Sequence, residues 1–349
     1  MTHETMPQMP HTPSDQPVRV LVTGATGYIG SRLVPALLEA GHDVRVLTRS
    51  RDKLAERSWI DRVDVVEGDA TRRRDLDTAL DGIEVAYYLL HSMDGGGDFE
   101  ERDRELARQF GLAAQAAGVR RIVYLSGLHP DQNAKGGLSS HLASRVEVGD
   151  LLMASGVPTV VLQAAIILGS GSASFEMLRH LTHNLPVMLT PKWVENRIQP
   201  IAIRDVLHYL VGAATMPGDP NRTFDIGGPE VLTYRDMIRR FAALNGWRPR
   251  PIVSVPVLTP RLASMWVSVV TPVPAGIAKP LVGSLVHEVV TQENDIDDVI
   301  GPPPGGALTY DEAVRSALGD TPRDDRGRPE PGTVDPAQLT AADPDWAGR

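Results

Sequence analysis

The sequence predicts an α/β fold: a Rossmann-type, doubly wound parallel sheet with a small, mostly helical C-terminal lobe. Three observations predict it. Short runs rich in Val, Ile and Leu alternate with helical patterns from residue 18 to residue 168, which is typical of βαβ units. The runs are almost continuously apolar, as expected for strands that are covered on both faces. A glycine-rich turn follows the first run and opens the first helix, at Thr23–Gly30.

The predicted elements follow this alternation along the chain. Six strands are expected, at Val18–Thr23, Asp43–Leu47, Val63–Glu67, Val85–Leu90, Arg121–Leu125 and Pro158–Gln163. Helices are expected between them, at Tyr28–Ala40, Asp52–Arg57, Arg73–Leu80, Phe99–Ala117 and Leu138–Ala154. After residue 168 the alternation fades, and we expect helices at Ser174–Asn184, Ile203–Ala214 and Tyr234–Leu244 and a short strand at Thr223–Ile226.

Composition divides the chain into four parts. Residues 1–17 are polar and proline-containing, without the apolar core of a secretory signal, and are expected to form a disordered leader. Residues 18–168 form the sheet domain, and residues 169–318 a smaller lobe packed on the sheet. Residues 319–349 are rich in proline and charge, which predicts a disordered tail.

Charge and cysteine content exclude several classes of protein. The chain has 35 Lys and Arg against 44 Asp and Glu, a net charge of −9, which argues against a nucleic-acid partner. The absence of cysteine excludes disulfides, thiol catalysis and cysteine-ligated metals, and fits a cytoplasmic protein. The apolar stretch Leu262–Ala278 is too short for a membrane span and is interrupted by Pro272 and Pro274.

The glycine-rich turn predicts a phosphate-binding loop. Gly24 permits the tight turn, Gly27 lets backbone N–H groups approach a pyrophosphate, and Gly30 lets helix and strand pack closely. The helix N-terminus adds a partial positive charge directed at the anion. The sequence therefore predicts that a dinucleotide binds here, at Gly24, Thr26, Gly27, Tyr28, Ile29 and Gly30.

The end of the second strand favours NADP(H) over NAD(H). An NAD site places a carboxylate there for the ribose hydroxyl, whereas Arg accommodates a 2′-phosphate. Here Arg49, Ser50 and Arg51 follow the strand; the alternative is a solvated basic turn. Asp69 and Ala70, just after the third strand, are expected at the adenine edge, although Asp69 is equally suited to cap the next helix.

Several motifs together carry a resemblance to a known family. T-G-A-T-G-Y-I-G at Thr23–Gly30, the Gly68-Asp69 pair and Y-L-S-G at Tyr124–Gly127 resemble the extended and atypical short-chain dehydrogenases/reductases, in particular the NmrA-like NAD(P)-binding group. The segments Arg197–Val206 and Phe224–Pro229 are also similar to that group. The resemblance implies that residues 18–168 form an NAD(P)-binding Rossmann domain.

The chain departs from this family at the catalytic helix. Dehydrogenases of the family use a Ser after the fifth strand, matched here by Ser126, and a Y-x-x-x-K pair on the next helix, which is absent. That helix instead offers His141 and Arg145, four residues apart and so on one face. In one reading His141 is the proton donor and Arg145 takes the role of the Lys. In the other, the pair only contacts cofactor ribose or forms a polar helix face.

Other candidate residues follow the fourth and sixth strands. Leu90 and His91 are expected at the cofactor edge, although an exposed loop position suits His91 equally, and the resemblance implies that Ala165 packs on the nicotinamide. Asp94–Gly97 suggests a lid or a flexible loop, and Met265–Val267 a substrate wall or ordinary core. His180 and His183 lie three apart on a helix without an accompanying carboxylate motif, so no metal site is expected.

These observations predict an NADPH-dependent oxidoreductase that acts on an apolar carbonyl, enone or quinone. One alternative is a non-catalytic NADP(H)-binding sensor or scaffold; another is a nucleotide-sugar epimerase or dehydratase. The expected partner is a small apolar substrate. The resemblance also suggests a homodimer through the helices of residues 99–117 and 138–154, as related enzymes often form, but the sequence does not fix the oligomeric state.

Overall fold

The computed structural model of the protein describes residues 17–91, 99–129, 138–185, 187–249, 251–254, 270–319, 335–340, 343–344 and 346–347. Among the features predicted from sequence, the leader up to residue 16, the Asp94–Gly97 loop and the Met265–Val267 segment lie outside these residues. Within them, no helix is both long enough and apolar enough to cross a membrane.

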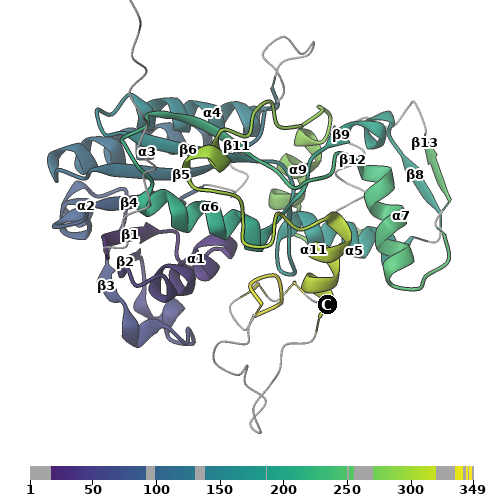
Figure 1. Ribbon diagram of the computed structural model, residues 1–349, viewed down its shortest axis with the longest axis horizontal. Helices are drawn as coiled ribbons and strands as arrows, with labels where there is room; N and C mark the ends of the chain where they lie inside the picture. The colour runs from purple at the N-terminus through teal and green to yellow at the C-terminus, as the bar shows by residue number, and fades with distance from the viewer. Residues whose placement is uncertain are drawn as a thin grey trace, which may run out of the picture.

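A seven-stranded sheet organises the molecule (Figure 1), and all of its neighbouring strands are parallel. Its strands are β1 (Arg19–Thr23), β2 (Asp43–Thr48), β3 (Asp64–Glu67), β4 (Val85–Tyr88), β5 (Arg121–Gly127), β6 (Thr159–Ala164) and β11 (Arg222–Ile226). The spatial order is β11-β6-β5-β4-β1-β2-β3. The winding reverses between β1 and β4, and ligands of such sheets bind outside the carboxyl ends of the strands at this point.

Helices cover both faces of the sheet, which confirms the predicted fold class. One face carries α1 and α6, and the other carries α2, α3 and α4 (Figure 1). The helices are α1 (Tyr28–Glu39), α2 (Arg73–Leu80), α3 (Phe99–Ala116), α4 (Ser140–Met153) and α6 (Ile203–Thr215). A short 3₁₀ turn, η1 (Arg51–Leu54), replaces the helix expected at Asp52–Arg57, and a second, η2 (Ile60–Arg62), precedes β3.

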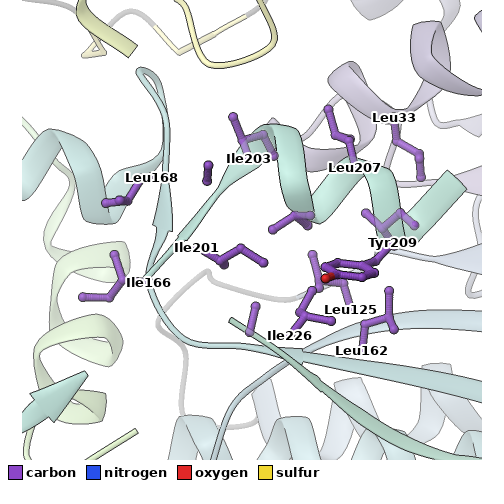
Figure 2. Packing of buried hydrophobic residues seen from close by; sticks show 14 of the residues in the cluster. Leu33, Leu125, Leu162, Ile166, Leu168, Ile201, Ile203, Leu207, Tyr209 and Ile226 are labelled. Carbon is purple, nitrogen blue, oxygen red and sulfur yellow. The ribbon is translucent and has the colours of Figure 1, made fainter. Parts of the chain in front are cut away.

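Alternation along the strands builds two apolar layers, because successive side chains point to opposite faces. On β5, Leu125 packs toward α1 and α6, whereas Tyr124 packs toward α3 and α4. Figure 2 shows the first layer, where Leu33 of α1 and Leu207 of α6 lie over the strands that carry Leu125 and Leu162. Two buried layers explain why the strands of this sheet read as continuous apolar runs.

One strand and one helix that the sequence placed in the smaller lobe are part of the sheet layers. β11 pairs in parallel with β6, Phe224 beside Leu162, and so forms the edge of the sheet. α6 packs on α1 and against β5 and β6. β11 has only five residues and is separated from β6 by a long stretch of the C-terminal lobe. Its own sequence does not indicate which strand it pairs with, so the pattern alone could not assign it to the sheet.

The C-terminal lobe is mostly helical, as predicted. Its helices are α5 (Ala173–Asn184), α7 (Tyr234–Leu244), α9 (Ala275–Ser284), α10 (Ile296–Val299) and α11 (Tyr310–Leu318), with the 3₁₀ turn η3 (Lys192–Glu195). Three two-stranded sheets connect them: β7 (Ile167–Leu168) with β10 (Ile201–Ala202), β9 (Arg197–Ile198) with β12 (Leu232–Thr233), and β8 (Met188–Thr190) with β13 (Ile252–Ser254).

Part of the predicted disordered tail is packed against the body of the protein. Ala337 is 1% exposed and belongs to the main core, and its carbonyl accepts a hydrogen bond of 2.7 Å from the Ser170 N–H. Gln338 is also buried. These residues depart from the predicted disorder, because long-range packing provides partners that proline and charge content does not reveal.

Candidate active site

Two glycines of the loop after β1 are required by the fold itself. Gly24 has a φ of +71°, and a Cβ there would lie 2.5 Å from the carbonyl oxygen of Leu89. A Cβ on Gly30 would lie 2.3 Å from the carbonyl oxygen of Gly24. Both distances are too short for any side chain, so these glycines permit the tight turn and the close helix–strand contact predicted from sequence.

Gly27 differs, because nothing inside the protein requires it to be glycine. Its backbone is extended, with φ −79° and ψ 170°, and a Cβ there would meet only the carbonyl oxygen of Gly24, at 3.3 Å. Gly27 is exposed, and no side chain caps the N-terminus of α1. A bare, uncapped helix start leaves N–H groups free for an anion. The loop therefore fits a pyrophosphate.

Of the other loop residues, one is exposed to solvent and two line a cavity. Thr26 is exposed, whereas Tyr28 and Ile29 are half-buried and line the cavity described below. The hydroxyl of Tyr28 is buried without a hydrogen-bond partner among the described residues. Burial raises the pKa of this hydroxyl above its usual range, so it remains a neutral donor.

The end of β2 presents two exposed cations, Arg49 and Arg51. Neither forms an ion pair with any residue that the structure describes. Between them, Ser50 is held in place because its carbonyl accepts a 3.0 Å hydrogen bond from Thr48 Oγ1. The Arg51 N–H donates to Glu67 Oε2 at 3.1 Å, which ties this turn to β3.

Asp69 closes a turn and does not cap the helix. Its Oδ1 accepts from the Thr71 N–H at 2.9 Å and from Thr71 Oγ1 at 2.8 Å, whereas the N-cap of α2 is Arg72. Hydrogen bonds from Thr71, with a smaller contribution from Arg49, hold the pKa of Asp69 below its usual range. Ala70 packs into the core under α2. The alternative of a helix cap at Asp69 is therefore wrong.

A cavity of about 390 Å³ lies at the carboxyl ends of β5 and β6. Its walls come from α1, α4, α5, α9 and the segment that contains Pro344 and Trp346. The cavity adjoins the glycine loop, because Tyr28 and Ile29 line it. Most of the lining is apolar, and Ala165 forms part of it, as the family resemblance implies.

Ser126, His141 and Arg145 all line this cavity, so the structure brings the three predicted catalytic residues together. Ser126 is buried, with its Oγ 3.5 Å from the carbonyl oxygen of Arg145. The Arg145 guanidinium donates through Nη2 to the carbonyl oxygen of Leu125. Its Nε is buried and has no hydrogen-bond partner among the described residues.

The environment of His141 does not suit the imidazolium proton donor of the first reading. Burial, together with the charge of Arg145, lowers the pKa of His141 to about 3. The ring is therefore neutral near pH 7. A neutral imidazole still donates a hydrogen bond through its N–H, as buried histidines that polarise carbonyls do.

His91 is inside the protein, next to His141, and not on an exposed loop. Its Nδ1 lies 3.2 Å from Asp103 Oδ2 on α3, and the centroids of the two imidazole rings are 4.9 Å apart. Burial lowers the pKa of His91, although Asp103 partly opposes this. The preceding Leu90 is half-buried and packs with the α2–α3 layer.

Residues 24–170 match the family model described as NAD(P)H-binding. This part of the chain is similar to the NAD(P)H-binding family. The match begins at the glycine loop and includes Ser126, His141 and Arg145, which line the cavity. It confirms the predicted resemblance and the predicted NAD(P)H-binding function.

Two curated relatives of this NAD(P)H-binding protein are reductases. The (4-alkanoyl-5-oxo-2,5-dihydrofuran-3-yl)methyl phosphate reductase of Streptomyces griseus is 29% identical over 253 residues, covering 70% of this chain and 80% of the relative. The ceramide reductase of Caulobacter vibrioides is 29% identical over 239 residues, covering 67% of this chain and 72% of the relative. The structure of the NADPH-dependent quinone oxidoreductase of Escherichia coli with NADPH aligns with a TM-score of 0.65 at 20% identity, covering 86% of this chain and 100% of that one.

Sequence reasoning missed three parts of the site. Asp103 has no sequence signal, because it lies among many charged residues on α3. Tyr28 was assigned to the phosphate loop, and its place in the cavity lining was not predicted. Trp346 lies in a region that composition alone marks as disordered. Among the described residues no group of His, Asp and Glu is arranged to hold a metal ion.

Proposed function

We propose that the protein is an NADPH-dependent oxidoreductase that reduces an apolar carbonyl, enone or quinone. One observation carries this proposal: an apolar cavity adjoins the glycine loop, and Ser126, His141 and Arg145 line it. Cavities that are mostly apolar and carry a few polar groups are typical binding sites for small molecules. A flat apolar molecule with one or two oxygen acceptors fits such a lining. That the relatives from Streptomyces griseus and Caulobacter vibrioides are reductases supports the reaction class.

The two cations at the end of β2 support a preference for NADPH over NADH. Arg49 and Arg51 are exposed, follow β2 directly and have no described ion-pair partner. Guanidinium groups bind phosphate through paired, charge-assisted hydrogen bonds. Each such hydrogen bond contributes about 1.5–3 kcal/mol, which is enough to distinguish the two cofactors by at least tenfold.

In the proposed reaction the bound dinucleotide supplies a hydride to the substrate. The protein's own residues bind and polarise the substrate oxygen. The neutral His141 donates a hydrogen bond to that oxygen, and Arg145 places a positive charge where negative charge develops. Because His141 does not hold a second proton near pH 7, the proton that completes the reduction comes from water.

His91 and Asp103 are positioning residues in this scheme. Asp103 orients the His91 ring, whose contact with the His141 ring limits rotation of that side chain. Ser126 lies beside Arg145, and its hydroxyl is close to the turn of α4 that carries this side chain. The arrangement keeps the donors in place without the Tyr–Lys pair of related dehydrogenases.

A binding-only role is the second candidate, and the lowered pKa of His141 favours it, because none of the described residues that line the cavity is a proton reservoir at neutral pH. Turnover distinguishes the two. We expect NADPH oxidation with menadione, chalcone or acetophenone, and a fall of kcat by tenfold or more in His141→Gln and Arg145→Met with NADPH affinity retained. NADPH binding without oxidation across the panel favours the sensor. Tightly held NAD that copurifies with the protein favours an epimerase.

Cofactor preference has its own test. Arg49→Ala is expected to weaken NADPH binding by about tenfold to a hundredfold and to leave NADH binding unchanged, as measured by calorimetric titration. Arg74→Ala is the matched control, because Arg74 is also exposed but lies on α2. Equal losses for both nucleotides would reject the 2′-phosphate role. A cytoplasmic location and a homodimer stay predictions of the sequence.

A further inference from the structure

A buried ion pair attaches the C-terminal segment, here residues 335–340, 343–344 and 346–347, to the helix of the glycine loop. Arg32 on α1 forms a two-pronged contact with Asp343, with Nη1 2.8 Å from Oδ1 and Nη2 2.7 Å from Oδ2. The two side chains are 2% and 3% exposed. A charge pair so completely removed from water persists only where its geometry and partners are good.

The remaining donors of Arg32 also hold this segment. Nε donates to the carbonyl oxygen of Pro336 at 2.8 Å, and Nη2 to those of Gln338 and Ser170 at 3.0 Å each. Gly171, with a φ of +90°, makes room for the carboxylate, because a Cβ there would lie 2.6 Å from Asp343 Cγ. Three regions far apart in sequence therefore meet at this pair.

The attached segment forms a wall of the cavity. Pro344 and Trp346, one and three residues after Asp343, both line it. Trp346 packs against an apolar cluster that includes Met177 of α5 and Ala278 of α9. A large aromatic side chain thus lines the same cavity as the proposed donors His141 and Arg145.

We propose that Trp346 determines the size of substrate that the cavity admits, and that the Arg32–Asp343 pair holds it in place. This inference rests on the proposed reductase function, because the cavity is the proposed substrate site. A role limited to anchoring the chain would not require the segment to contribute side chains to the cavity. Without the indole the cavity is larger and open at this wall.

The first arm of the test measures substrate selectivity. Trp346→Ala is expected to raise kcat/KM for phenanthrenequinone relative to benzoquinone by tenfold or more, and Asp343→Asn to change the ratio in the same direction. Trp247→Ala is the matched control: this half-buried Trp packs against Phe241 and does not line the cavity. An unchanged ratio in a folded Trp346→Ala protein would overturn the proposal, as would an equal change in the control.

The second arm does not depend on turnover. Binding of the apolar dye anilinonaphthalene sulfonate is titrated with NADPH present, and NADPH affinity is measured separately. We expect dye affinity to change at least fivefold in Trp346→Ala and Asp343→Asn, with NADPH affinity retained. If the wild type reduces neither quinone, the proposed reductase function is rejected. The dye measurement still tests whether Trp346 limits the size of the cavity. Should Trp346→Ala not fold, Trp346→Leu replaces it, and dye binding like the wild type's rejects the inference.

Discussion

Replacing Gly27 by Ala is expected to weaken NADPH binding while leaving the stability of the fold almost unchanged. Its φ of −79° suits any residue, and the added Cβ meets only Gly24 O, at 3.3 Å. Ala is a poorer helix N-cap than Gly, but it also reduces the entropy of the unfolded chain, so the net change in unfolding free energy is within about 1 kcal/mol. The same methyl group stands on the exposed side of the loop, where phosphates approach. Losing two charge-assisted N–H contacts costs about 3 kcal/mol or more, roughly a hundredfold in Kd.

Calorimetric titration with NADPH, beside thermal unfolding, checks this prediction. Gly30→Ala serves as the contrasting variant, because its Cβ would lie 2.3 Å from Gly24 O and must disturb both folding and binding. Gly283→Ala is the neutral control, since its Cβ would meet only Ser139 Cβ, at 3.9 Å. A Gly27→Ala protein that binds NADPH as tightly as the wild type would refute the assignment of the phosphates to this loop.

Two further predictions concern stability. The pKa of His141 is about 3 in the folded protein, below its usual value of 6.5, so only the unfolded chain takes up this proton as the pH falls through that window. His141 therefore makes stability fall by about 1.4 kcal/mol per pH unit on acidification. Urea unfolding across this window should show a shallower slope for His141→Gln, and the same slope as the wild type would contradict the burial argument. Phe110 is fully buried, with its ring centroid 5.0 Å from that of Tyr88, and Phe110→Ala should cost about 3–5 kcal/mol. Leu112→Ala, on the same helix but 48% exposed, should stay within about 0.5 kcal/mol; equal losses in urea unfolding would argue against this packing.

The sheet was predictable because its signals are local. Apolar runs such as that of β1, the glycine turn after it and glycines at helix ends each lie within a few residues of the element they define. The strands and most helices before residue 168 accordingly appear where expected, with ends shifted by a few residues, whereas a 3₁₀ turn replaces the helix expected at Asp52–Arg57. β11 was placed in the smaller lobe because its pairing with β6 joins residues 62 positions apart, Arg222 and Val160.

The candidate site was predictable only where a motif fixes it. The loop glycines and the i, i+4 pair of His141 and Arg145 can be recognised in the sequence, and both lie at the cavity or its edge. The ionisation state of His141 could not be predicted, because it depends on burial and on charges brought together by folding. Asp103 and Trp346 reach the site through tertiary packing, which no short motif encodes.

Following the transferred hydrogen shows directly whether the cavity beside the glycine loop is a site of NADPH-dependent reduction. The protein is incubated with NADPH deuterated at nicotinamide C4 and a panel of aromatic ketones and enones, and the products are analysed by mass spectrometry. We predict one deuterium on carbon in the reduced product, with strongly reduced transfer in Arg145→Met. Bound NADPH without label in any product would contradict the account and indicate a binding-only protein.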